Sequence, residues 1–255
     1  MLPQQQVPPL NSSHKNTQRS SLIRTQSSTR RKSQTTLQLS HAKTEPLLVL
    51  ACGALAREIQ QLKLLNGWEH IRIQCLDAEL HNRPKLIAGK LREKLELLRD
   101  EYRNIFIAYA DCGSGGDIDR VMDEFSTDEN TIERLPGAHC YAFFAGIEAF
   151  DEMAEEALGT FYLTDFLAQH FERLIIKGMK LDKHPELKPM MFGNYTRLVY
   201  LSQTHSEKLH IAAKKAADYL GVDYEHRHTG YGLLESGLET QVINFTNSIE
   251  FQPRE

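Results

Sequence analysis

Cysteine, tryptophan and long apolar segments are scarce in this chain of 255 residues. It has four cysteines and one tryptophan, too few thiols for a fold of this length to depend on disulfides. The apolar stretch at residues 47–55 is shorter than the ~18 residues that a membrane helix needs, and it lacks the cleavage site of a secretory signal. We therefore expect a cytoplasmic protein with no membrane partner.

The signatures of several enzyme classes are also missing. The chain has no Cys-x-x-Cys pair and no Gly-x-Ser-x-Gly nucleophile turn. Its glycine-rich segment, CGSGGD at 112–117, lacks the spacing of a Rossmann fingerprint and the lysine of a P-loop. Anion binding at the helix that follows this segment stays open. Motifs therefore do not decide whether the protein is an enzyme.

Charge is unevenly distributed along the chain. Residues 1–45 carry seven Lys or Arg and one Glu, a net charge of +6, which leaves −10 for the remainder because the whole chain carries −4. This segment is rich in Ser, Thr and Gln without apolar periodicity, so we predict a disordered tail. Its composition also resembles that of a transit peptide. Residues 46–250, which carry the net negative charge, are predicted to form one α/β domain. We expect this domain to bind no nucleic acid.

From Pro46 onward, short apolar runs alternate with helical patterns. The predicted strands are 47–52, 71–76, 104–109, 131–135, 196–201 and 222–225, the predicted helices are 54–67, 84–99, 118–125, 138–150, 159–177, 206–220 and 231–238, and 181–189 is a predicted loop. The first four strands start about 25–33 residues apart, the spacing of βα units with right-handed crossovers. We predict a mostly parallel open sheet flanked by helices, a Rossmann-like three-layer α/β fold. The second half either completes that sheet or forms a small second lobe.

Four side chains that bind soft metals follow successive strands of the first half. Cys52 ends the first strand, His81 follows the second, Cys112 ends the third and Cys140 follows the fourth. They are 29, 31 and 28 residues apart, close to one βα unit each. Because the carboxyl ends of parallel strands meet at one sheet edge, where ligands bind, we expect these side chains to converge. Cys75 lies within the second strand and is assigned to the core.

The neighbouring residues favour ligand binding at this edge. Gly53, Gly113 and Gly116 leave room for close approach of a ligand. Asp111 is expected to hydrogen-bond the site or to cap the next helix. Each strand-end cysteine precedes a predicted helix, whose N-terminal dipole lowers the pKa of a thiol.

The donor set suits a metal ion or a cluster. Thiolates and a neutral imidazole bind zinc, the first choice, or an iron–sulfur cluster. The predicted metal ligands are Cys52, His81, Cys112 and Cys140, with His139 as an alternative imidazole. Two competing interpretations are that the cysteines are small buried hydrophobic residues near strand ends, or that they form a redox dithiol.

Two further groups of polar residues are weaker candidates. Arg57 and Glu58 lie one turn into the first helix and are interpreted as a solvated face in preference to an ion pair. His226, His228 and Tyr231 follow the last strand and either line the cleft or belong to a surface loop.

The segments that carry these residues resemble a bacterial and archaeal family, domain of unknown function 1638 (DUF1638). The matching pieces are ACGALAREI at 51–59, LHNRPKL at 80–86, YADCGSGG at 109–116, AHCYAFFAG at 138–146 and GTFYL at 159–163. The resemblance is clear over 46–165 and looser beyond, and it implies that the family's Cys and His positions are Cys52, His81, Cys112 and Cys140. The chain departs from the family pattern in Tyr-Ala-Asp at 109–111 and in His139, which directly precedes Cys140.

Members of this family are associated with corrinoid-dependent methyl-transfer systems. The resemblance therefore implies a metal- or cofactor-binding protein that supports one-carbon metabolism. Corrinoid methyltransferase components would be its partners, and the corrinoid itself would be involved only indirectly. The alternatives are a non-catalytic binding protein with a structural zinc site, and an enzyme that acts on a small molecule with a cysteine nucleophile and a histidine base.

Overall fold

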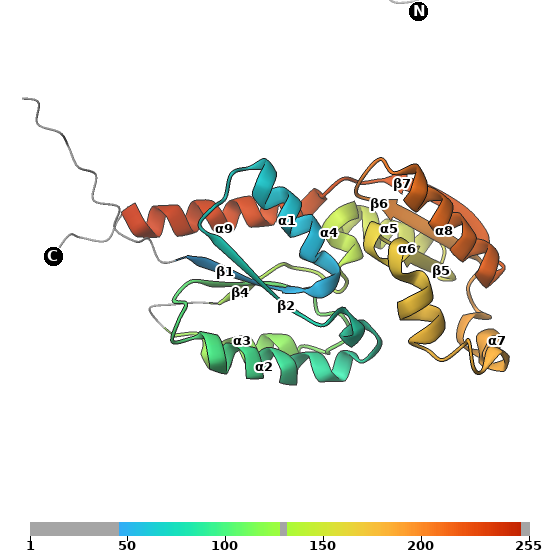
Figure 1. Ribbon diagram of the computed structural model, residues 1–255, viewed down its shortest axis with the longest axis horizontal. Coiled ribbons are helices and arrows are strands. Elements are labelled where there is room, and N and C mark those ends of the chain that lie inside the picture. The colour runs from blue at the N-terminus through green and yellow to red at the C-terminus, as the bar shows by residue number, and fades with distance from the viewer. Residues whose placement is uncertain (1–45, 128–131, 251–255) are drawn as a thin grey trace, which may run out of the picture. The chain divides into compact units, whose positions relative to one another are not determined.

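The computed structural model describes residues 46–127 and 132–250, which belong to one compact unit, Ala42–Glu255. The tail predicted at residues 1–45 lies outside the described residues. Strands in the described part form two parallel sheets, with the orders β2-β1-β3-β4 and β5-β6-β7 (Figure 1). The predicted parallel α/β fold is confirmed, and the second half forms a sheet of its own.

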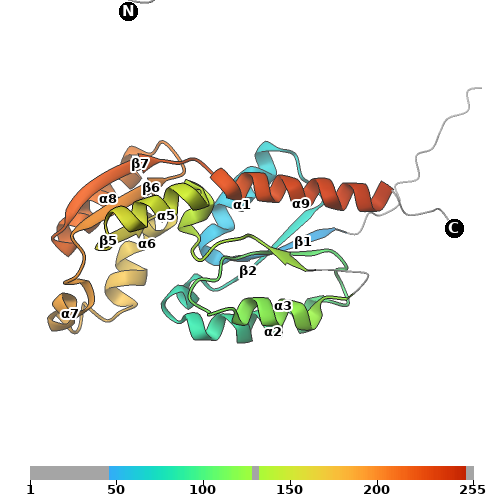
Figure 2. The ribbon, with the colours of Figure 1, turned by 180° about the vertical axis from the view of Figure 1, so that it is seen from behind.

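The first sheet is covered on both faces. Its strands are β1 (Leu47–Cys52), β2 (Ile71–Leu76), β3 (Ile105–Ala108) and β4 (Glu133–Arg134). Its helices are α1 (Ala56–Leu65), α2 (Ile87–Leu98), α3 (Asp117–Phe125) and α9 (Gly232–Glu250), with short 3-10 turns at Gly53–Leu55, Ala78–Asn82 and Pro84–Leu86. Figures 1 and 2 show α1 and α9 on one face and α2 and α3 on the other. Every residue of β1 and β3 is buried, as two covered faces require.

The second sheet repeats this plan with three strands. Its strands are β5 (Thr160–Leu163), β6 (Arg197–Ser202) and β7 (Asp223–His228). Its helices are α4 (Tyr141–Ala145), α5 (Ile147–Glu156), α6 (Asp165–Phe171), a π-helical turn at Glu172–Lys177, a 3-10 turn at Pro185–Leu187, α7 (Lys188–Phe192) and α8 (Glu207–Leu220).

Alternate side chains of β6 belong to different apolar clusters. Leu198 and Tyr200 pack with residues of α6 and α8, whereas Val199 and Leu201 pack with residues of α4 and α5. This period of two is what a strand buried between two helical layers produces. The second sheet is therefore also the middle of three layers.

Several predicted boundaries were wrong. The predicted helix at 159–177 begins as β5, because four strand residues are too few to interrupt a helical pattern visibly. The predicted helix at 138–150 is divided between α4 and α5 at Gly146, which has a φ of +86°. The predicted loop at 181–189 contains a 3-10 turn and the start of α7. The last helix continues far beyond residue 238, because Val242 and Phe245 pack into the core of the first sheet. None of the helices in the described residues is long and apolar enough to cross a membrane.

Candidate functional site

The carboxyl end of β1 is tightly packed. A Cβ atom on Gly53 would lie 2.8 Å from the carbonyl oxygen of Leu76 and 3.0 Å from the backbone nitrogen of Ala78. Only glycine therefore lets the ends of β1 and β2 approach this closely. Burial raises the pKa of the Cys52 thiol to about 11, so this thiol is protonated at neutral pH. The predicted lowering of the Cys52 pKa is wrong, because desolvation by burial outweighs the backbone hydrogen bond with Ala54, which lowers the pKa.

The glycine-rich turn after β3 is organised around the carboxylate of Asp111. This carboxylate accepts hydrogen bonds from Gly113 N (3.2 Å), Gly115 N (3.1 Å), Gly116 N (2.7 Å) and the Ser114 hydroxyl (2.8 Å). Burial raises the pKa of Asp111, but these hydrogen bonds outweigh the effect of burial, so that the pKa of Asp111 is lowered. The amides that an anionic ligand would use are therefore already bonded to a side chain of the protein.

Cys112 and Cys140 are brought together by the backbone. Asp111 N donates to the Gly137 carbonyl at 3.1 Å, and Cys112 N donates to the Ala138 carbonyl at 2.9 Å. The Cys140 thiol is a hydrogen-bond partner of the Cys112 sulfur and lowers the pKa of Cys112 in spite of burial. The same hydrogen bond and burial raise the pKa of Cys140 well above its ordinary value. The pKa of Cys112 is therefore lowered by its neighbouring thiol and not by the predicted helix dipole, and the predicted lowering is wrong for Cys140.

Cys112 also has an unusual backbone conformation. Its φ is +50°, in the left-handed region that residues other than glycine rarely occupy. Such a conformation persists only where the surrounding contacts impose it, and it is frequent at functional sites. Here the hydrogen bonds of the Asp111 turn and of the 137–138 segment impose it.

Two histidines lie near the thiol pair. His81 belongs to the 3-10 turn after β2 and is half-buried, and burial, together with the neighbouring His139, lowers its pKa. A neutral imidazole, the form that binds metals, is therefore favoured at His81. The next residue, Asn82, donates a hydrogen bond to the Leu174 carbonyl at 2.7 Å, which ties this turn to the helices of the second sheet.

These side chains line a cavity of about 560 Å³. His81, Cys112, His139 and Cys140 supply its polar, reactive wall. Aromatic residues that follow Cys140 in the chain supply much of the remainder, namely Tyr141, Phe150, Phe161, Tyr162 and Tyr195. This volume lies within the range of about 300–1,000 Å³ that is typical of small-molecule sites.

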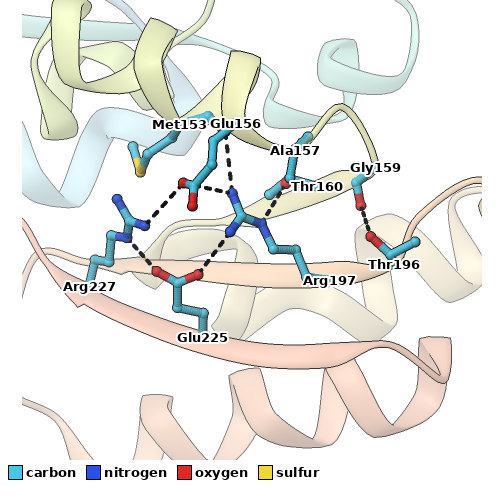
Figure 3. Close-up of polar contacts among 9 residues, drawn as sticks. All are labelled: Met153, Glu156, Ala157, Gly159, Thr160, Thr196, Arg197, Glu225 and Arg227. Carbon is cyan, nitrogen blue, oxygen red and sulfur yellow. Dashed lines mark hydrogen bonds and ion pairs between the residues drawn. The ribbon is translucent and has the colours of Figure 1, made fainter.

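A charged network holds the part of the cavity wall that comes from the second sheet (Figure 3). Arg197 Nε donates to Thr160 Oγ1 at 2.8 Å, and its guanidinium forms ion pairs with Glu225 (3.3 Å) and Glu156 (3.5 Å). Arg227 in turn donates to Glu225 at 2.5 Å. Thr160 itself lines the cavity, so these contacts fix the position of β5 beside α5 at the site.

The predicted ligand set is only partly assembled. Cys112, Cys140 and His81 line the cavity, whereas Cys52 lies beside the thiol pair but is not among the lining residues. The predicted cofactor-binding residues Gly53, Asp111, Gly113 and Gly116 are also not among the lining residues. They shape the turns around the cavity. Within residues 46–127 and 132–250, no three His, Cys, Asp or Glu side chains are arranged to hold a metal ion. The donor types suit zinc, but their positions do not form a closed four-ligand site.

Sequence reasoning missed the aromatic wall and two buried polar groups. Tyr141 follows Cys140 directly, so the aromatic-rich segment after the cysteine was the available signal. The hydroxyl of Tyr109 is buried beside Cys52, and burial, followed by the effect of that thiol, raises the pKa of Tyr109 well above its ordinary value. Glu58, interpreted above as solvated, is instead 3% exposed, and its Oε2 has no hydrogen-bond partner in the described part of the chain.

Fold and site together define an α/β protein with two parallel sheets and a thiol-lined cavity. Residues 75–238 match the family described as "Protein of unknown function (DUF1638)", and the chain belongs to this family. The matched region includes His81, Cys112 and Cys140, and it begins after Cys52. No curated protein and no solved structure matches the chain.

Proposed function

We propose that this protein binds a small molecule in the cavity, and that the sulfur atoms of Cys112 and Cys140 contact a soft metal ion or an electrophilic centre that this molecule carries. The observation that supports the proposal is the pair of neighbouring thiols on the wall of a cavity of about 560 Å³. A metal ion alone needs far less space, so the volume argues for a larger occupant.

The first form of this proposal is a metal- or cofactor-binding protein. Two cysteine sulfurs and a neutral imidazole from His81 are ligand types that zinc accepts, and an iron–sulfur cluster is the second choice. A zinc site that keeps an open position uses three protein ligands and takes its fourth from the substrate or water. Because the described side chains do not converge as three ligands on one point, the bound molecule would have to supply the missing coordination. A structural zinc site, which needs four protein ligands, fits this geometry less well.

The second form is an enzyme with Cys112 as the nucleophile. The lowered pKa of Cys112, its left-handed backbone and its place on the cavity wall favour this role. His81 and His139 line the same cavity and would serve as proton acceptor or donor. Cys140 would then stabilise the thiolate of Cys112.

Metal titration of the full-length, untagged and reduced protein tests the first form. We expect zinc to be withdrawn from a chromogenic chelator, and we expect this competition to be lost in Cys112→Ser and Cys140→Ser and weakened in His81→Ala. Cys75→Ser is the matched control, because Cys75 lies within β2 and does not line the cavity. Equal zinc binding by folded wild type, Cys112→Ser and Cys140→Ser would refute metal binding by this pair.

Alkylation of the metal-free protein tests the second form. Iodoacetamide should modify Cys112 first, with a rate that already rises below the ordinary pKa of a thiol. Modification of Cys75 before Cys112 would contradict a nucleophilic Cys112. A supporting role in corrinoid-linked methyl transfer is a further proposal, which depends on the family resemblance alone. Co-purification with a corrinoid methyltransferase component would test it.

A further inference from the structure

The structure holds Cys112 and Cys140 as a pair although they are far apart in the sequence. The two backbone hydrogen bonds from Asp111 N and Cys112 N to residues 137 and 138 keep the two cysteine segments side by side. Neither cysteine is in a disulfide. Both residues are half-buried and line the cavity.

We propose that Cys112 and Cys140 form a redox-active pair, which a hydroperoxide converts into a disulfide that withdraws both sulfur atoms from ligand binding. The redox reaction stands on the placement of the two thiols. Its consequence for ligand binding rests on the function proposed above.

The reaction proceeds in two steps. The Cys112 sulfur attacks the terminal oxygen of the hydroperoxide, the O–O bond breaks, and the proton of the Cys112 thiol passes through water to the departing alkoxide, which leaves as an alcohol. Cys112 is then a sulfenic acid, and the peroxide has accepted two electrons. The Cys140 sulfur attacks the Cys112 sulfur, the S–O bond breaks, and water leaves with the Cys140 proton. Two thiols and one hydroperoxide thus give one disulfide, one alcohol and one water.

The surroundings assign the roles of the two cysteines. Cys112 lies in the strained turn after β3, with a φ of +50°, and is assigned as the attacking residue, with Cys140 on the same cavity wall as the resolving thiol. Cys52 is excluded as the primary target because it is 9% exposed and does not line the cavity. Cys75 lies on β2 opposite Ala51 and is equally absent from the cavity wall.

Peroxide treatment of the reduced, metal-free, full-length protein tests the inference. With one equivalent of hydrogen peroxide, two of the four thiols should be lost, and peptide mapping without reduction should find a link between the peptides that contain Cys112 and Cys140. Dithiothreitol should restore all four thiols. The mapping uses the wild-type chain, so the result does not depend on the folding of any variant.

Variants then separate the two steps. Cys140→Ser should stop at a sulfenic acid on Cys112 that a 1,3-diketone traps, Cys112→Ser should give neither product, and Cys75→Ser should behave as wild type. Retention of all four thiols, or a link that joins Cys52 or Cys75, would overturn the inference.

Zinc competition by the reduced and the oxidised protein completes the test. We expect the reduced protein to bind zinc and the oxidised protein to lose binding. A disulfide that forms in a protein unable to bind zinc when reduced would leave the redox pair standing and refute metal binding. If the reduced protein binds zinc but peroxide forms no disulfide, metal binding stands and the redox pair is refuted.

Discussion

The two sheets share one plan, with parallel strands between helical layers, but they are stabilised differently. In the first sheet, β1 and β3 are buried along their whole length and contain no charged residue. In the second sheet, β6 and β7 carry Arg197, Glu225 and Arg227 in a network of ion pairs. The buried carboxylate of Asp165 accepts hydrogen bonds from Tyr200 Oη (2.6 Å) and from residue 204.

This difference corresponds to what each sheet contributes to the cavity. Cys112 follows the buried apolar strand β3, and desolvation and one hydrogen bond set the pKa values of Cys112 and Cys140 in opposite directions. The second sheet contributes mainly aromatic surface, and polar contacts such as that between Arg197 and Thr160 hold this surface in place. Three substitutions test whether the two sheets do depend on different forces.

Removal of apolar volume from the first sheet should have the largest effect. Leu50 in β1 is fully buried, so Leu50→Ala should lower the free energy of unfolding by about 2–5 kcal/mol, through lost burial and a residual cavity. Urea denaturation followed by circular dichroism measures this. The control is Leu97→Ala on the exposed face of α2, where Leu97 is 75% exposed. A similar loss of stability from both variants would show that the burial of Leu50 in β1 does not stabilise the first sheet.

The charge of Glu58 should have the next largest effect, because this carboxylate lies near Asp165, at the start of α6, which packs on the second sheet. Burial, followed by smaller contributions that include Asp165, raises the pKa of Glu58 from 4.5 to about 7. The folded state therefore binds this proton more tightly than the unfolded state. The free energy of unfolding should thus fall by about 3 kcal/mol as the pH rises from 4.5 to 7, and this contribution should change little above pH 7.

Glu58→Gln keeps the shape of the side chain and cannot ionise. The variant should match the wild type near pH 4.5 and exceed its stability at pH 8, where the wild type carries a buried charge. Denaturation curves of both proteins across this pH range give the difference in their free energies of unfolding at each pH. The contributions of all other titrating groups cancel in this difference. Parallel curves for the two proteins would show that Glu58 is solvated when folded.

Loss of the charge on Asp165 should have the smallest effect of the three. Asp165→Asn leaves one acceptor oxygen for the Tyr200 hydroxyl but presents an amide to the donors of Thr204, which should cost about 1–3 kcal/mol. Asp223→Asn at the exposed start of β7 is the matched control. If the Asp165 variant is as stable as the control, the second sheet does not depend on this polar network.

Some features of the fold could be predicted because they depend on local pattern. The continuous apolar run of β1 predicted a buried strand, the leucine spacing of α2 predicted the helix between β2 and β3, and both are confirmed. β5 was missed because Thr160–Leu163 is short and flanked by helical sequence. The full length of α9 was missed because its apolar residues pack on a sheet whose strands lie much earlier in the chain, between residues 47 and 134.

The candidate site was likewise predictable only in part. The periodic placement of Cys112, Cys140 and His81 after successive strands predicted that they would lie near one another, and all three line one cavity. The burial of Cys52 could not be predicted, since Gly53 permits a backbone approach that depends on β2. The opposite pKa shifts of Cys112 and Cys140 were also hidden, because they depend on a contact between side chains far apart in the sequence.

By itself, the sequence determined the parallel α/β class, the order of most elements and the edge of the sheet where the thiols gather, because hydrophobic periodicity and βα spacing are local properties. Only the tertiary structure decided that the strands divide into two sheets, that the carboxylate of Asp111 fills the glycine-rich turn, and that Glu58 is buried with its Oε2 unpaired among the described residues. Burial and pairing are set by residues that the chain brings together on folding. Their free energies depend on those neighbours, which no local stretch of sequence specifies.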